Sequence, residues 1–201
     1  VPTADENFAD AYGKLAFYHA LSYHYRLDRT KDRLVQSKKS YEKAISIDST
    51  NLISRQGRGY YHYYANMNYY RAINDFEYAM RIEPGNSEHI YNVALIQRRL
   101  GLWNLSTKNF KLALKVNPGS WQQVWNMSLQ GGLLRDSLLM KKYVDKAIEI
   151  NPRITNGYIS KANYIVNIQG NPEKSLKMLD ESEVDNIERL TMKKISIARL
   201  N

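Results

Sequence analysis

The chain has 201 residues, of which 43% are hydrophobic and 24% charged, a balance typical of folded globular proteins. Cysteine is absent, which excludes disulfides, thiolate metal sites and a cysteine nucleophile in this sequence. The 29 Lys and Arg against 20 Asp and Glu give a net charge of +9. Because the basic residues are spread along the chain, we interpret them mainly as a solvated surface, with a preference for an acidic partner as the alternative.

No stretch of about 18 apolar residues occurs, so we expect no transmembrane segment and no membrane contact from this sequence. Residues 1–7 contain neither the basic nor the apolar region of a secretory signal peptide. The sequence also does not begin with Met, and we therefore expect it to be a segment of a longer protein. These observations leave the compartment open.

A repeat with a period of about 34 residues runs along the chain. Successive alanines are 35, 34 and 34 residues apart, and three prolines keep a spacing of 34. The repeated residues are Ala44, Ala79, Ala113 and Ala147, and Pro84, Pro118 and Pro152. An alanine at a fixed position predicts a close approach of two helices, where a larger side chain would force the backbones apart. A proline shortly afterwards predicts the end of a helix, because proline cannot continue one.

These residues resemble the tetratricopeptide-repeat (TPR) family, in which each unit is a pair of antiparallel helices that buries its apolar faces only by stacking on its neighbours. The resemblance implies an all-α, right-handed superhelical solenoid in a single domain over residues 1–201. Its predicted repeats span residues 5–51, 52–86, 87–120, 121–154 and 155–183. Residues 184–201 are expected to form a C-terminal helix with Ile187, Leu190 and Ile195 along one stripe.

The first repeat is longer than the others. Leu15 and Ala16 match the Leu-Gly pair of the TPR pattern, and Tyr41 and Ala44 match its second helix. The step from Leu15 to Tyr41 is 26 residues instead of 17, so nine extra residues lie within residues 21–33. We expect lengthened helices or a protruding loop there.

The following repeats keep the period with local departures. The second is one residue longer and has Arg58 and Gly59 where Leu-Gly is usual. The third is the best match, and its signature residues are Ile90, Val93, Ala94, Gly101, Ser106, Phe110 and Ala113. In the fourth, Arg135 replaces the turn glycine, while Gly131 and Gly132 predict a frayed or kinked first helix.

Two helix starts carry capping signals. Ser120 with Gln123 three residues later predicts a capping box. Asn171, Pro172 and Glu173 predict, in that order, a cap, a helix-starting proline and an acid in the first turn.

No motif for catalysis or cofactor binding is visible. The histidines are His19, His24, His62 and His89. They form no His-Glu-x-x-His motif, and His19 and His24 are five residues apart, which does not place them on one helical face. Residues 57–59, Gly-Arg-Gly, lack the third glycine and the preceding strand of a phosphate-binding loop. We therefore predict no enzyme activity, no metal site and no cofactor.

The 16 tyrosines and the positive charge raise nucleic-acid binding as an alternative, since aromatic stacking and basic residues together bind single strands. In TPR proteins, however, aromatic residues at helical spacing fill the core between helices. The basic residues here also lack the one-sided clustering of a nucleic-acid interface. We therefore expect no nucleic-acid partner.

The TPR resemblance places the binding groove on the first helix of each repeat, where residues three, four and seven apart share a face. Carried onto this chain, the groove positions are Tyr60, Tyr63, Tyr91, Asn92, Leu95, Arg98, Arg99, Trp125, Asn126, Leu129 and Asn163. Asn92 and Asn126 occupy the same repeat position, where an amide can hold the main chain of an extended peptide. The alternative is that asparagine is simply frequent in this chain. We expect Tyr60, Tyr91 and Trp125 to form an aromatic strip beside these two asparagines. Because groove residues face solvent, replacing both asparagines with Ala should weaken binding and leave the stability nearly unchanged.

The long first repeat, the Tyr-rich second and the Arg-Arg-Leu-Gly-x-Trp segment at residues 98–103 are similar to the repeat segments of bacterial adenylate cyclases, Ser/Thr kinases and winged-helix regulators. The resemblance implies a non-catalytic scaffold that binds a protein or peptide, acidic by preference, as the sensory or assembly region of a larger signalling protein. A self-association module or spacer, forming homo-oligomers, is the alternative. A chaperone-tail adaptor is disfavoured, because Gln56 and Tyr60 stand where a carboxylate clamp needs Lys and Asn.

Overall fold

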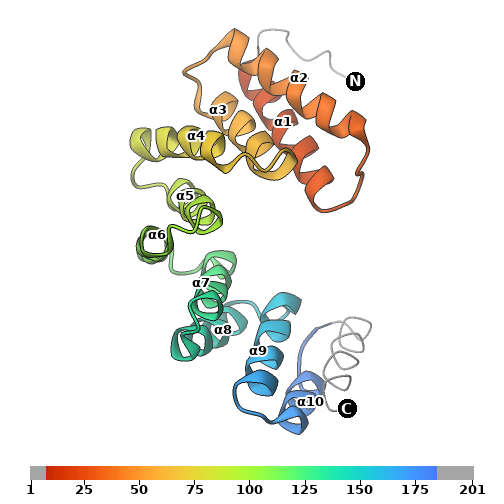
Figure 1. Ribbon diagram of the computed structural model, residues 1–201, viewed down its shortest axis with the longest axis vertical. Coiled ribbons are helices and arrows are strands. Elements are labelled where there is room, and N and C mark those ends of the chain that lie inside the picture. Colours follow the sequence, from red (N-terminus) through yellow and green to blue (C-terminus); the bar gives the residue numbers. More distant parts are fainter. Residues whose placement is uncertain (1–7, 185–201) are drawn as a thin grey trace. The chain divides into compact units, whose positions relative to one another are not determined.

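The computed structural model describes residues 8–184, and every regular element in this range is helical (Figure 1). The elements are α1 (Ala9–His24), α2 (Lys31–Ile47), α3 (Leu52–Tyr60), the π-helical segment η1 (Tyr61–Ala65), α4 (Tyr69–Ile82), α5 (Ser87–Arg99), α6 (Trp103–Val116), α7 (Trp121–Leu133), α8 (Ser137–Ile150), α9 (Thr155–Asn167) and α10 (Pro172–Asp180). The predicted all-α class is confirmed. The predicted C-terminal stripe of Ile187, Leu190 and Ile195 lies outside the described residues.

The chain divides into two compact units. Unit 1 ends at Asn109 and unit 2 begins at Phe110, so the boundary falls within α6. Each unit is built from consecutive helices packed in pairs, such as α1 with α2 in unit 1 and α7 with α8 in unit 2. The single domain over residues 1–201 stays a prediction.

Small residues set how closely the two helices of a pair approach. All four repeated alanines have no exposed surface, which confirms the packing position predicted for them. In unit 1, Ser37 Oγ of α2 donates to the carbonyl of Ala16 in α1 at 2.8 Å, and Ser106 Oγ of α6 donates to the carbonyl of Ala94 in α5 at 2.8 Å. Ala16 therefore takes its predicted position, whereas Leu15 beside it is exposed and does not match the apolar motif position.

Six of the nine extra residues of the first repeat lengthen its two helices, and the other three lengthen the connection between them. α1 has 16 residues and α2 has 17, against 13 for α5 and 14 for α6. The connection between α1 and α2 is held by Asp28, which accepts from Arg33 Nε at 2.6 Å and from the Thr30 amide at 3.2 Å. Lengthened helices, one of the two predicted outcomes, are therefore observed.

The one extra residue of the second repeat has a different outcome. α3 passes directly into η1, and together they are one residue longer than α5, the equivalent helix of the third repeat. In a π-helical turn the bonded groups are five positions apart instead of four, so the turn absorbs an added residue without ending the helix. Because of the insertion, the side chains at the end of this helix point in other directions than they would in an uninterrupted α-helix.

The turn inside each helix pair contains one residue with left-handed backbone geometry. These residues are Arg26, Met67, Gly101, Arg135 and Gly170. Arg135 has a φ of 58°, so it takes the conformation of the glycine that it replaces. A side chain in this region strains the backbone, which Gly101 and Gly170 avoid.

Two local predictions for unit 2 are wrong. α7 continues through Gly131 and Gly132 to Leu133. A Cβ on Gly131 would lie 2.5 Å from the backbone nitrogen of Met140, so this position has no room for a side chain. The glycine thus allows α8 to start close against α7. Ser120 is the N-cap of α7, but its side chain makes no capping bond, and the side chain of Gln123, expected to complete the box, is buried. By contrast, Asn171 caps α10 as predicted, accepting from the Lys174 amide at 2.9 Å.

Candidate peptide-binding groove

The groove of unit 1 starts where α1 and α3 cross. A Cβ on Gly13 would lie 2.5 Å from the carbonyl oxygen of Ile53, and one on Gly57 would lie 2.5 Å from the carbonyl oxygen of Gly13. The two glycines therefore let the helix backbones touch, and a cavity of about 330 Å³ opens beside the crossing. Its lining residues are Gly13, Lys14, Phe17 and Tyr18 of α1, Ile53, Gln56, Gly57 and Tyr60 of α3, and Glu88 of α5.

An aromatic floor leads from this cavity along α3 and η1. The Phe17 ring lies 4.4 Å from the Tyr60 ring, centroid to centroid. Tyr60 stacks nearly parallel on Tyr64 at 5.8 Å, and Tyr64 contacts Tyr63 at 4.7 Å and His24 at 4.5 Å. Tilted and stacked aromatic pairs of this kind hold each other in place, so the floor is preorganised for a ligand.

The side chain of Asn92 is hydrogen-bonded to another residue of the chain. Its amide nitrogen donates to the hydroxyl of Tyr60 at 2.9 Å, and only 6% of the residue is exposed. The prediction that Asn92 faces solvent is therefore wrong, because the tyrosine of the neighbouring repeat occupies its amide. Burial raises the pKa of Tyr60 well above its usual range, so the hydroxyl keeps its proton at neutral pH.

The predicted positions of unit 2 lie on α7 and α9. Trp125 Nε1 donates to Ser160 Oγ at 3.1 Å, which ties the two helices together. Asn126 is buried as well and donates to the carbonyl of Gln122 at 3.0 Å. Leu129 and Asn163 are half-buried. The aromatic strip that would join Tyr60 and Tyr91 to Trp125 stays a prediction.

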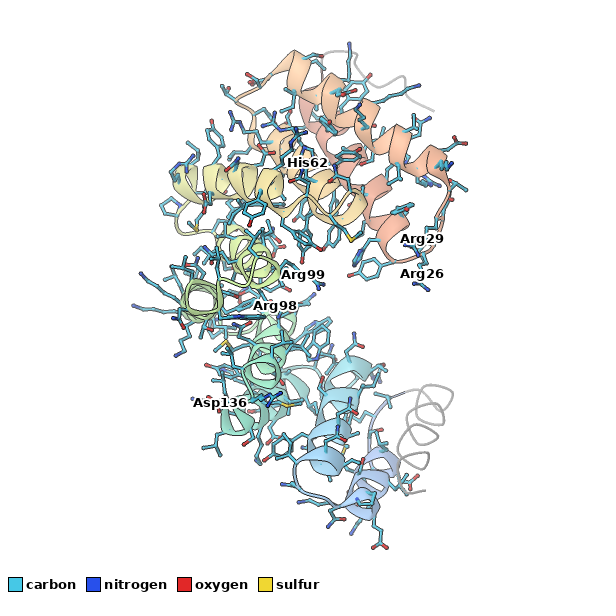
Figure 2. All side chains as sticks on the ribbon, viewed as in Figure 1. Arg26, Arg29, His62, Arg98, Arg99 and Asp136 are labelled. Carbon is cyan, nitrogen blue, oxygen red and sulfur yellow. The ribbon has the colours of Figure 1, made fainter. Side chains whose placement is uncertain are left out.

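Positive charge gathers at the far end of the unit 1 groove. Arg99, the last residue of α5, is hydrogen-bonded to the Tyr63 side chain. Burial lowers the pKa of Arg98, and it lowers the pKa of His24 at the end of α1, with a further contribution from the charge of Arg99. The ends of α1 and α5 both reach η1, since the His24 ring lies 4.5 Å from the Tyr64 ring and Arg99 bonds to Tyr63. Figure 2 shows the arginines of both segments, Arg26 and Arg29 after α1 and Arg98 and Arg99 on α5.

Leu95 and Tyr91 complete the predicted set. Leu95 is buried, and Tyr91 is half-buried with its pKa raised well above the usual range, mainly by burial. Glu88 lines the cavity, and burial raises its pKa too, so its carboxylate prefers a cationic or hydrogen-bond-donating neighbour.

Sequence reasoning missed the contribution of α1. Gly13, Lys14, Phe17 and Tyr18 were not among the predicted groove positions, although they line the cavity. The signal was available, because Gly13 and Phe17 are four residues apart and so share a helix face. The lengthened first repeat obscured which residues of α1 correspond to the groove positions of later repeats.

No protein-family model and no curated protein matches the sequence. Solved structures do match. YrrB, described as a TPR protein with an unusual peptide-binding site, is 18% identical with a TM-score of 0.60, covering 98% of this chain and 92% of its own. A thermophilic TPR protein of Thermus thermophilus is 12% identical with a TM-score of 0.69, covering 94% and 98%. Yeast Tom70 is 16% identical with a TM-score of 0.71, covering 98% of this chain and 41% of its own.

The chain has the tetratricopeptide-repeat fold. At these identities the likeness shows the fold alone, so the chemistry of this TPR chain must be argued from its own residues. Within residues 8–184, no group of three or more His, Asp or Glu is placed to hold a metal ion. No helix in this range has both the length and the apolar content needed to cross a membrane.

Proposed function

We propose that the chain is a non-catalytic module that binds an extended segment of another protein in the groove formed by α1, α3, η1 and α5. The proposal rests on the aromatic cavity at Phe17 and Tyr18 and on the ring contacts that lead from it through Tyr60 to Tyr64 and Tyr63. Tyr63 is in turn hydrogen-bonded to Arg99 at the end of α5. Aromatic residues and arginine dominate binding energies at protein interfaces. A rigid floor of tyrosines supplies this contact area at little entropic cost.

The two ends of the groove specify the partner. The cavity of about 330 Å³ is large enough for one aromatic or branched aliphatic side chain and is lined mainly by apolar atoms of Phe17, Tyr18 and Ile53. The arginine end favours Asp or Glu. The bound segment should therefore carry an apolar anchor followed or preceded by acidic residues, and its affinity should fall as salt rises.

The wider role is a scaffold within a larger assembly. The TPR resemblance and the described peptide-binding site of YrrB support the holding of a polypeptide over catalysis. We extend the proposal to the sensory or assembly region of a larger signalling protein, on the likeness of the first three repeats to such segments. A self-association module or spacer is the alternative, favoured by the exposed Leu138 on α8.

Display of random peptides against the purified chain tests the proposal. Tyr18 is 59% exposed at the cavity, and Tyr70 on α4 is 75% exposed without lining it, so Tyr70→Ala is a matched control for Tyr18→Ala. We expect selected peptides to combine an apolar anchor with acidic residues. Tyr18→Ala should weaken the binding of these peptides by about tenfold, since loss of one buried aromatic contact costs about 1–2 kcal/mol. Tyr70→Ala should leave their binding unchanged. Equal binding by both variants would contradict the proposal.

A further inference from the structure

A second recess of unit 1 shares no residue with the groove cavity. It has a volume of about 390 Å³ and receives residues from α2, α3, η1 and α4. Its lining residues are Tyr41, Arg58, His62, Arg71, Asn74 and Asp75, all of them polar or charged. The recess is therefore a polar site separate from the groove cavity.

The bottom of this recess is an ion pair. Arg58 Nε and Nη2 donate to the two carboxylate oxygens of Asp75 at 2.9 and 2.6 Å, and Asp75 is only 2% exposed. Both oxygens of Asp75 are thus engaged by one guanidinium. Arg58 is held in a fixed orientation, while its remaining N–H groups are available to another acceptor.

Arg71 adds a second positive charge at the rim. It is exposed on α4, lines the recess and forms no ion pair with any residue of the described range. Glu42, beside Tyr41, is already paired with Lys38 at 3.6 Å, and Asp75 is the one acid among the residues that line the recess. Two guanidinium groups therefore face one carboxylate, and one positive charge is left over.

The π-helical turn brings His62 into the same recess. The Asn66 amide nitrogen contacts His62 Nδ1 at 3.3 Å, and because an amide nitrogen only donates, Nδ1 accepts and Nε2 carries the hydrogen. His62 is buried, which lowers its pKa, so the ring is neutral at about pH 7.5 and acts there as a hydrogen-bond donor. Its ring centroid lies 5.9 Å from that of Tyr41, whose hydroxyl is a further donor.

We propose that this outer recess binds a phosphate group, as inorganic phosphate or as a small phosphate ester. Donors from Tyr41, Arg58, His62 and Arg71 converge from four elements, which suits the several terminal oxygens of a phosphate better than the two of a carboxylate. The volume exceeds that of a phosphate alone, so the organic part of an ester also fits. The π-helical turn has a function on this view, since such turns often mark ligand sites.

Nuclear magnetic resonance titration of the full chain at about pH 7.5 tests this site, with inorganic phosphate, O-phosphoserine and acetate added in turn at matched ionic strength. Phosphate or O-phosphoserine should shift the signals of Tyr41, His62 and Arg71 with saturation, and should leave Tyr18 in the groove unmoved. Stronger binding of O-phosphoserine identifies an ester site, and stronger or equal binding of inorganic phosphate identifies a free-anion site. Both outcomes support the proposal.

Matched arginine variants separate a site from general charge attraction. Arg71→Gln should weaken phosphate binding by about tenfold, the effect of losing charge-assisted hydrogen bonds, while Arg81→Gln on the same helix should change it less than about twofold. Tyr41→Phe, which removes a single hydroxyl, serves if Arg71→Gln fails to fold. Equal shifts with acetate, absence of saturation, or equal losses in Arg71→Gln and Arg81→Gln would overturn the proposal.

Discussion

The second and third repeats occupy equivalent places in the fold but use different chemistry. Val93 of the third repeat is fully buried, and Asn109 donates to Gln97 at 2.9 Å. The residues at the equivalent places in the second repeat, 35 and 34 positions earlier, are Arg58 and Asp75, which form an ion pair between a half-buried guanidinium and a buried carboxylate. At these two positions the third repeat thus has an apolar residue and an amide, and the second repeat has two opposite charges.

This difference shows how a repeat departs from its pattern without losing the fold. Arg58 is tolerated where an apolar residue is usual because Asp75 pairs with it, and the added residue is absorbed by η1. Both departures line the outer recess, while Tyr60 and Tyr64 of the same segment line the groove path. The third repeat, which follows the pattern, contributes mainly packing and the arginine end of the groove.

The largest expected effect concerns what the two repeats share. Ala79 and Ala113 are equivalent and have no exposed surface, so Ala79→Arg and Ala113→Arg should each remove about 4 kcal/mol or more of stability through overpacking and an unpaired buried charge. Circular-dichroism melts would show early unfolding in both. Ala→Ser at the same sites is the control that keeps the volume small. An unchanged melt for either arginine variant would contradict the repeat alignment.

Replacing both members of the Arg58–Asp75 ion pair should cost less stability than removing one of them. Asp75→Asn alone leaves the Arg58 charge without its carboxylate and should cost about 3 kcal/mol in urea unfolding. The double variant Arg58→Val with Asp75→Asn, which installs the residue types of the third repeat, should recover most of that loss. Additive losses in the double variant would show that the two repeats are not interchangeable at these positions.

The pH dependence of stability should distinguish the second repeat. Burial lowers the pKa of His62, so the unfolded chain binds more protons than the folded chain below about pH 6.5. Stability should therefore be full above that pH and fall as pH decreases through the lower, folded value. His62→Gln should flatten the slope measured by urea unfolding between about pH 7.5 and 5.

Part of the slope should remain in the His62→Gln variant. Burial also lowers the pKa of His19 and of His24, and these residues respond to acid with the same sign. An unchanged slope would mean that His62 titrates as it does in the unfolded chain.

The smallest effects are expected at the turns. Gly101 has a φ of 74°, so Gly101→Ala should lower stability by about 1 kcal/mol, while Arg135→Gly should raise it by about 0.5–1 kcal/mol through relief of the strained backbone. Thermal melts of the two variants give the comparison directly. Shifts of the same sign would show that backbone strain does not decide these turns.

The sequence predicts the features that depend on the repeat period and on local capping rules. The buried alanines, the position of the turn at Arg135 and the Asn171 cap all follow from repeat spacing and local rules. It does not predict how side chains meet across helices. Gly131 was assigned a flexible role because nothing in the local sequence shows that Met140 packs against it.

The candidate site was predicted only in part for the same reason. Asn92 was expected to face solvent, yet it donates to Tyr60, so Asn92→Ala should reduce stability by about 1 kcal/mol instead of leaving it unchanged. The contacts of Phe17 with Tyr60, and hence the role of α1, depend on a crossing that the lengthened first repeat hides. Spacing identifies a helix face, but partners on other helices decide whether that face is free.

Chemical-shift mapping of the chain with the tightest displayed peptide tests the groove most directly. We predict that the largest chemical-shift changes fall on residues lining the cavity, such as Lys14, Tyr18 and Gln56, and extend to Arg99. Tyr41 and Arg71 of the outer recess should not respond to this peptide. Changes concentrated on the outer recess or on unit 2, with the cavity residues unmoved, would contradict the assignment of the groove as the peptide-binding site.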